Sequence, residues 1–110
     1  MIVRTWRCRA PFDRPDDYVA HFNSKVLPEL HAVDGFVSAM LLRRNRKHDI
    51  EFLVVTIWAS IEAIHGFAGA AYDRAVVEPG AVAALASFDE AAEHYEVVNA
   101  AVAGMPGSPD

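Results

Sequence analysis

The chain has 110 residues, of which 10 are basic and 15 acidic, and its net charge is -5 at pH 7. This length fits one small domain, and the acidic balance excludes a ligand bound mainly through phosphate neutralisation, so nucleic acid is not an expected partner. Cys8 is the only cysteine, which excludes an intrachain disulfide and a thiolate zinc site. No signal peptide and no apolar run of about 20 residues are found, so we expect a soluble cytoplasmic protein without membrane contact.

A strand and a long helix are predicted first. Residues 2–10 are rich in β-branched and aromatic side chains, and Pro11 ends this strand. A helix is expected from about Pro15 to Asp34-Gly35, with Pro28 causing a kink or an early last turn. Its apolar stripe recurs in steps of three and four residues and comprises Tyr18, Val19, Phe22, Val26, Leu27, Leu30 and Val33. The face expected to meet water carries His21, Lys25 and Glu29.

The next two strands are predicted at residues 36–44 and 49–59, joined by a polar, basic hairpin tip at residues 45–48. Residues 52–58 show no polar alternation, a pattern typical of a strand buried on both faces. One layer of helices covers only one face of a sheet. We therefore expect a second copy of the chain to cover the other face.

The last part of the chain is predicted to hold a short helix and a final strand. Ser60 is the expected cap of the helix, whose apolar stripe includes Ile64 and Phe67. Residues 72–88 are expected to form a loop with about one turn of helix, and residues 93–98 alternate as a strand. The predicted domain covers residues 1–98, and the Gly- and Pro-containing residues 99–110 are expected to be a disordered tail.

The predicted order of elements is β-α-β-β-α-β. This order defines an α+β, ferredoxin-like fold with a four-stranded antiparallel sheet and two helices on one face. Two such subunits that pack their free sheet faces together would form a two-sheet barrel, so the expected state is a homodimer.

Three segments resemble the antibiotic biosynthesis monooxygenase family: Val33-Asp34-Gly35-Phe36, Val55-Thr56-Ile57-Trp58-Ala59-Ser60 and His94-Tyr95-Glu96-Val97. The resemblance covers residues 1–98 and implies the dimeric α+β barrel that characterises this family. It also implies oxygenation of a small aromatic or hydrophobic molecule without a cofactor.

The resemblance also allows two branches of the family to be compared with this chain. The branch that oxidises aromatic polyketides has an Asn and a Tyr at the positions of Val54 and Ile64, and shares Trp58. The haem-degrading branch has a Trp and an iron-binding His at the positions of Phe67 and Val77. Valine cannot bind iron, so haem degradation is the third choice unless a histidine such as His65 takes that position.

Oxygenation without a cofactor needs a base, an apolar chamber for oxygen and a donor to the developing negative charge. His94 is the predicted base, with pairing to a carboxylate at the subunit contact as the structural alternative. Trp58 is the second predicted catalytic residue, with packing in the core as its alternative. The residues predicted to line a pocket are Arg4, Trp6, Phe22, Val54, His65, Phe67 and Tyr72.

Several of these residues have a second interpretation. Arg4 and Trp6 share one face of the first strand and would be interface residues if that face met the partner, while His65 and Tyr72 could lie at the surface or rim. No metal spacing and no glycine-rich nucleotide loop is present, so neither a metal nor flavin or NAD is expected. The alternative function is a non-catalytic dimer that binds a small hydrophobic ligand.

Overall fold

The structure is a computed structural model that describes residues 1–103. Within these residues the strands form one antiparallel sheet in the order β2-β3-β1, and β4 and β5 both pair with β1 at its other edge. The strands are β1 (Ile2–Pro11), β2 (Phe36–Asn45), β3 (Asp49–Trp58), β4 (Ser87–Phe88) and β5 (Glu93–Glu96). This order confirms the predicted ferredoxin-like α+β fold, and the sheet does not close on itself within one chain.

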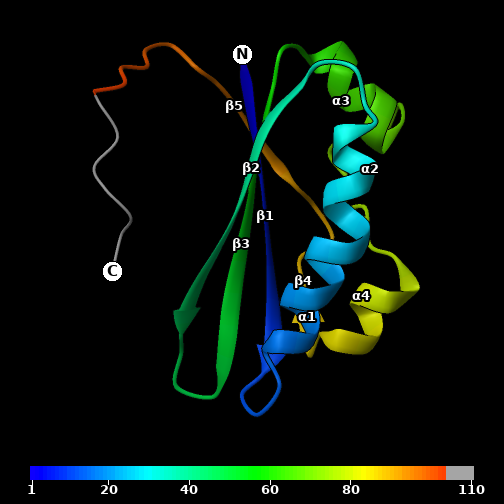
Figure 1. Cartoon of the computed structure of the whole chain (residues 1–110), viewed down its shortest axis with the longest axis vertical. Helices are drawn as coiled ribbons and strands as arrows, with labels where there is room; N and C mark the ends of the chain where they lie inside the picture. Colours follow the sequence, from blue (N-terminus) through cyan, green and yellow to red (C-terminus); the bar gives the residue numbers. More distant parts are fainter. Residues whose placement is uncertain (104–110) are drawn as a thin grey trace.

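All the helices lie on one side of the sheet (Figure 1). They are α1 (Asp16–His21), η1 (Phe22–Val26), α2 (Leu27–His31), α3 (Ile61–Ala68) and α4 (Pro79–Ala84). The first three are consecutive parts of one helical run, and α4 packs against α1. Within residues 1–103 the other face of the sheet carries no helix.

The irregularity expected at Pro28 lies one turn earlier. The backbone N–H of Leu27 donates to the carbonyl of Phe22, a five-residue step that makes η1 a π-helical turn. Proline has no N–H to donate, and a π turn just before it changes the register of the helix by one residue. Pro28 then occupies the first turn of α2, where a backbone N–H is not required for a hydrogen bond within the helix.

The ends of the elements follow local sequence signals. The Ser60 side chain accepts a hydrogen bond from Ala63 N at 3.2 Å, which confirms the predicted helix cap. The region 72–88 contains α4 and the short strand β4, more structure than expected, and β5 ends at Glu96. Residues 97–103 have no regular structure, and the rest of the predicted tail lies outside the described residues.

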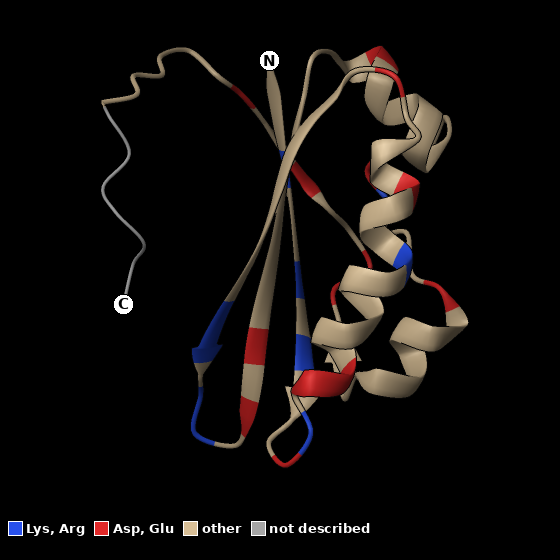
Figure 2. Ribbon diagram, viewed as in Figure 1, with Lys and Arg blue, Asp and Glu red and all other residues tan. Residues whose placement is uncertain are grey.

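The two faces of β3 differ in environment. Phe52 and Trp58 point to the helices and are fully buried, whereas Leu53 and Val55 point to the free face and are half-buried. Charged residues gather at the hairpin end of the sheet (Figure 2). There Glu51 accepts from Arg44 at 2.8 Å, while the rest of the sheet is largely apolar.

Gly35 connects the long helical run to β2 under tight constraints. Its φ is +87°, and a Cβ on it would lie 2.6 Å from the Ala63 side chain of α3. We expect Gly35→Ala to lower the free energy of unfolding by about 2–3 kcal/mol, from the unfavourable φ and the clash together. Gly66→Ala is the control, because its Cβ would meet only Val33 at 3.4 Å and alanine favours a helix. Urea denaturation of both variants measures the difference, and equal stabilities would contradict the constraint.

Candidate functional site

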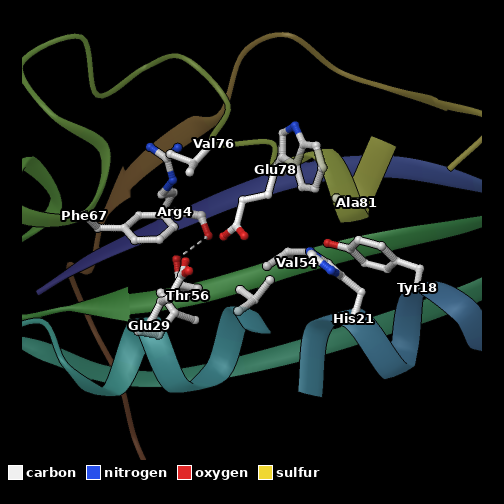
Figure 3. A pocket seen from close by; sticks show the side chains of 13 residues that line it. Arg4, Tyr18, His21, Glu29, Val54, Thr56, Phe67, Val76, Glu78 and Ala81 are labelled. Atoms are coloured by element: carbon white, nitrogen blue, oxygen red, sulfur yellow. Dashed lines mark hydrogen bonds between the residues drawn. The ribbon is translucent and has the colours of Figure 1, made fainter. Parts of the chain in front are cut away.

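A cavity lies between the sheet and the helical layer (Figure 3). Its volume is about 50 Å³, and its walls are mainly apolar with a few polar groups. The apolar lining residues are Trp6, Val26, Leu30, Val54, Phe67, Val76 and Ala81. The polar ones are Arg4, Tyr18, His21, Glu29, Thr56 and Glu78.

Arg4 is the buried cation of the cavity wall. Its side chain projects from β1 toward the helices, and the residue is only 5% exposed. One terminal nitrogen donates to the Tyr72 carbonyl, and the other donates to the Arg74 carbonyl at 2.9 Å. Arg4 therefore ties the segment between α3 and α4, which supplies Val76 and Glu78 to the cavity, to the centre of the sheet.

His94 lies directly opposite Arg4 on the neighbouring strand β5. Its Nε2 is 3.0 Å from Arg4 Nη1. A guanidinium can only donate, so Nε2 accepts this bond and the imidazole is neutral. Burial, and then the positive charge of Arg4, lower the pKa of His94, while Asp73 has an opposing effect.

Tyr72 stands between two histidines beside this cation. Its ring centroid is 5.0 Å from that of His65 and 5.0 Å from that of His94. His65 is exposed, so the column of three rings runs from the surface of α3 to the buried guanidinium. These rings cover Arg4 but do not line the cavity.

Trp58 is fully buried in the hydrophobic core. Its indole packs between Phe36 and Phe67 at centroid distances of 5.5 and 5.6 Å. Its Nε1 donates to the Thr56 hydroxyl at 2.8 Å. Thr56, in turn, lines the cavity, so Trp58 orients a polar group of the wall without touching the cavity itself.

His21 and Tyr18 project from α1 into the cavity, contrary to the expectation that His21 faces water (Figure 3). The imidazole Nε2 of His21 is buried and has no hydrogen-bond partner within residues 1–103. Tyr18 is 2% exposed, and burial raises the pKa of its phenol, while burial raises the pKa of the neighbouring Cys8 thiol to about 12. Both groups therefore stay protonated at neutral pH.

Two glutamates line the cavity, and they come from different elements. Glu29 comes from α2 and Glu78 from the residue that precedes α4, and Figure 3 shows the Glu78 carboxylate directed into the cavity. The nearby carboxyl of Glu78 is the main cause that raises the pKa of Glu29. Glu29 was expected to face water; it is exposed and also lines the cavity.

The predicted site residues fall into three places. Arg4, Trp6, Val54 and Phe67 line the cavity. His94, Tyr72 and His65 surround Arg4, and Trp58 supports Thr56. Phe22 is buried and lines a different groove, between the helical run and β2.

Sequence reasoning missed five polar groups of the cavity, namely Tyr18, His21, Glu29, Thr56 and Glu78. The predicted apolar stripe of the first helix includes Tyr18, and His21, three residues later, lies close to the same helix face. The signal for His21 was therefore present in the spacing. Glu78 had no signal, because its place depends on how α4 packs against α1.

Within residues 1–103 no three His, Cys, Asp or Glu side chains are grouped so that they could hold a metal ion. Over the same range no helix combines the length and the apolar character that spanning a bilayer requires.

Comparison with known proteins identifies the class. The sequence profile of the antibiotic biosynthesis monooxygenases matches residues 1–79, so the chain belongs to this family. Comparison with curated protein sequences gives no match.

Solved structures share the fold at low sequence identity. A presumed antibiotic biosynthesis monooxygenase from Bacillus cereus aligns with a TM-score of 0.65 and 19% identity, covering 96% of this chain and 98% of the other. SnoaB from Streptomyces nogalater, a cofactor-independent oxygenase, gives a TM-score of 0.59 and 18% identity over 90% and 95% of the two chains. A mutant of MhuD with two manganese protoporphyrin IX molecules per active site gives 0.59 and 20% identity over 94% and 100%.

The role of Arg4 leads to a prediction about stability. We expect Arg4→Ala to lower the free energy of unfolding by about 2–3 kcal/mol, because two backbone carbonyls and His94 lose a charged donor. Amide hydrogen exchange should also become faster in residues 72–78, which Arg4 ties to the sheet.

Arg43→Ala is the matched control, on strand β2 and on the side of the sheet that carries the helices. Arg43 pairs with Asp16 at 3.8 Å, and both side chains are exposed. An exposed pair contributes less than about 1 kcal/mol, so neither stability nor exchange in residues 72–78 should change much. Equal effects of the two variants would contradict the role given to Arg4.

Proposed function

We propose that the chain is a monooxygenase that uses molecular oxygen on a small aromatic molecule without a cofactor. The observation that supports this proposal most directly is the apolar cavity with one buried cation, Arg4, in a chain of the antibiotic biosynthesis monooxygenase family. An apolar wall favours a ring and dissolved oxygen, and a fixed positive charge favours the anion that forms when a phenol loses its proton.

The reaction class that fits is the conversion of a phenol to a quinone. One oxygen atom of O₂ is inserted at the ring carbon opposite the hydroxyl group, and the other leaves as water. The ring supplies both electrons, so the atoms balance without a flavin or an external reductant. SnoaB, which shares the fold, is a cofactor-independent oxygenase and supports this choice.

The size of the cavity sets a condition on substrate binding. A volume of about 50 Å³ is smaller than the ~150 Å³ that accommodates benzene in an engineered cavity. An aromatic substrate therefore requires the segment that carries Val76 and Glu78 to move outward. Residues 69–78 have no helix or strand of their own. The hydrogen bonds that hold this segment come from Arg4 and from two backbone pairs, Ala75 with Glu90 and Asp73 with Ala92, and they would have to yield.

The alternative is a protein that binds a small hydrophobic ligand without chemistry. Its support is that Val54 and Ile64 offer no hydrogen bond where the polyketide oxygenases have polar side chains. Haem degradation is a third choice: MhuD binds a metalloporphyrin, but Val77 offers no iron ligand and His65 stacks on Tyr72. We place the protein in the cytoplasm, with which a free, buried Cys8 is compatible.

Oxygen incorporation tests the proposed reaction. The purified protein with 1-naphthol under ¹⁸O₂ should release 1,4-naphthoquinone that carries one ¹⁸O atom, with one O₂ consumed per quinone. Mass spectrometry and an oxygen electrode measure the two quantities. The control substrate is 4-methyl-1-naphthol, whose blocked ring carbon prevents quinone formation. Binding of 1-naphthol without oxygen uptake would instead favour the non-catalytic alternative.

We also propose that the protein works as a homodimer joined through the free face of the sheet. Strand register places a set of apolar side chains on this face, among them Met40 and Tyr95, which are 50% and 55% exposed. The full set is Val3, Met40, Leu42, Leu53, Val55, Ile57 and Tyr95. An uncovered apolar patch of this kind is typical of an interface, and a second copy supplies a matching one.

Size-exclusion chromatography with light scattering tests the dimer. The expected mass is about twice 12.1 kDa. Leu53→Lys should give monomers, because a buried, unpaired charge at the centre of the face is costly. Val82→Lys is the control on the helical side, where Val82 is 51% exposed, and it should remain dimeric. A wild-type monomer at micromolar concentration would exclude this assembly.

A further inference from the structure

The His21 ring contacts residues of two helices, α1 and α4. Its ring centroid is 6.0 Å from that of Tyr18, which precedes it by one turn on α1. On the other side the imidazole rests on Gly80 of α4, where an added Cβ would lie 2.9 Å from Nδ1 and 3.1 Å from Cε1. Because glycine has no Cβ, the first turn of α4 leaves the space that the imidazole ring occupies.

The unpartnered nitrogen of this ring calls for an explanation. His21 lines the cavity, and its Nε2 is buried and has no hydrogen-bond partner within residues 1–103. Buried polar atoms are nearly always paired, because leaving one unpaired costs free energy. A ligand that enters the cavity would supply the missing partner.

We propose that His21 is the general base of the oxygenation, an assignment that rests on the proposed function. Imidazole is the side chain that exchanges protons near neutral pH, and His21 lines the cavity that a phenol would enter. His94 is less suited, because its Nε2 already accepts from Arg4. Tyr18 is less suited, because burial keeps its phenol protonated.

The proton and electron steps balance around this base. Nε2 of His21 takes the phenol proton, and O₂ bonds to the opposite ring carbon, receiving an electron pair from the phenolate. The imidazolium returns its proton to the peroxide. His21 then removes the hydrogen of the same carbon while the O–O bond breaks, and the released hydroxide takes that proton as water, leaving a quinone.

The charged groups around the cavity are compatible with these transfers. Glu29 and Glu78 reach the cavity from α2 and from the residue that precedes α4. Arg4 lies on β1 and favours the phenolate. The substrate anion is thus expected between the guanidinium and the imidazole.

Two readouts on the same variants test this role. The first is the turnover of 1-naphthol. The second is the absorption of bound 4-nitrophenol at a pH below the pKa of the free probe, which reveals whether the cavity removes its proton. His21→Gln should lower turnover by about a hundredfold or more and should abolish the phenolate band. His48→Gln, at the exposed hairpin tip, should leave both unchanged.

Gly80→Ala separates the position of the ring from its presence. The added Cβ displaces the imidazole, so turnover should fall by about tenfold or more although the histidine remains and alanine favours the helix. Circular dichroism should show native folding in this variant and in His21→Gln.

Each remaining outcome has a defined meaning. If His21→Gln keeps the wild-type rate and phenolate band, or if His94→Gln or Glu78→Gln loses them in its place, the assignment is overturned. If the wild type ionises 4-nitrophenol through His21 but consumes no oxygen with 1-naphthol, His21 remains the proton acceptor and only the oxygenation fails. A wild type with neither signal overturns both proposals.

Discussion

The burial of one guanidinium organises the part of the molecule where chemistry is expected. Arg4 is 5% exposed, and its donors reach the carbonyls of Tyr72 and Arg74 and the imidazole of His94. A buried charge is tolerated only when its hydrogen bonds are made. The segment after α3 and the strand β5 are therefore drawn to the centre of β1, and the cavity acquires its cover.

The hydrogen bonds of Arg4 also distinguish the two histidines near the site. His94 accepts a bond from Arg4 and lies outside the cavity, whereas His21 lines it with a nitrogen that has no partner within residues 1–103. A histidine with a satisfied lone pair stabilises structure, and one with a free lone pair can accept a proton. The two histidines thus differ in their hydrogen bonding because of their neighbours alone.

The strand β3 links the site to the proposed assembly. Val54 points to the cavity, while its neighbours Leu53 and Val55 point to the free face. Because side chains alternate along a strand, the same run of apolar residues builds a wall of the site and the surface on which a second subunit would pack. In a dimer, the partner subunit would therefore pack against the face of β3 opposite the cavity.

Periodicity and local signals in the sequence predicted the main helices and strands, their order and hence the fold, because these depend on local properties such as the Ser60 cap and the apolar run of β3. The pattern of the first strand predicted Arg4 as a pocket residue and the family resemblance predicted Val54, and both line the cavity. The spacing of His21 from Tyr18 places it near the buried face of the helix, but the tertiary structure decided which histidine lines the cavity. The π turn before Pro28 changes the helix register, and the packing of Gly80 against His21 joins segments 59 residues apart. Contacts at that separation leave no period in the sequence, so only the folded chain shows them.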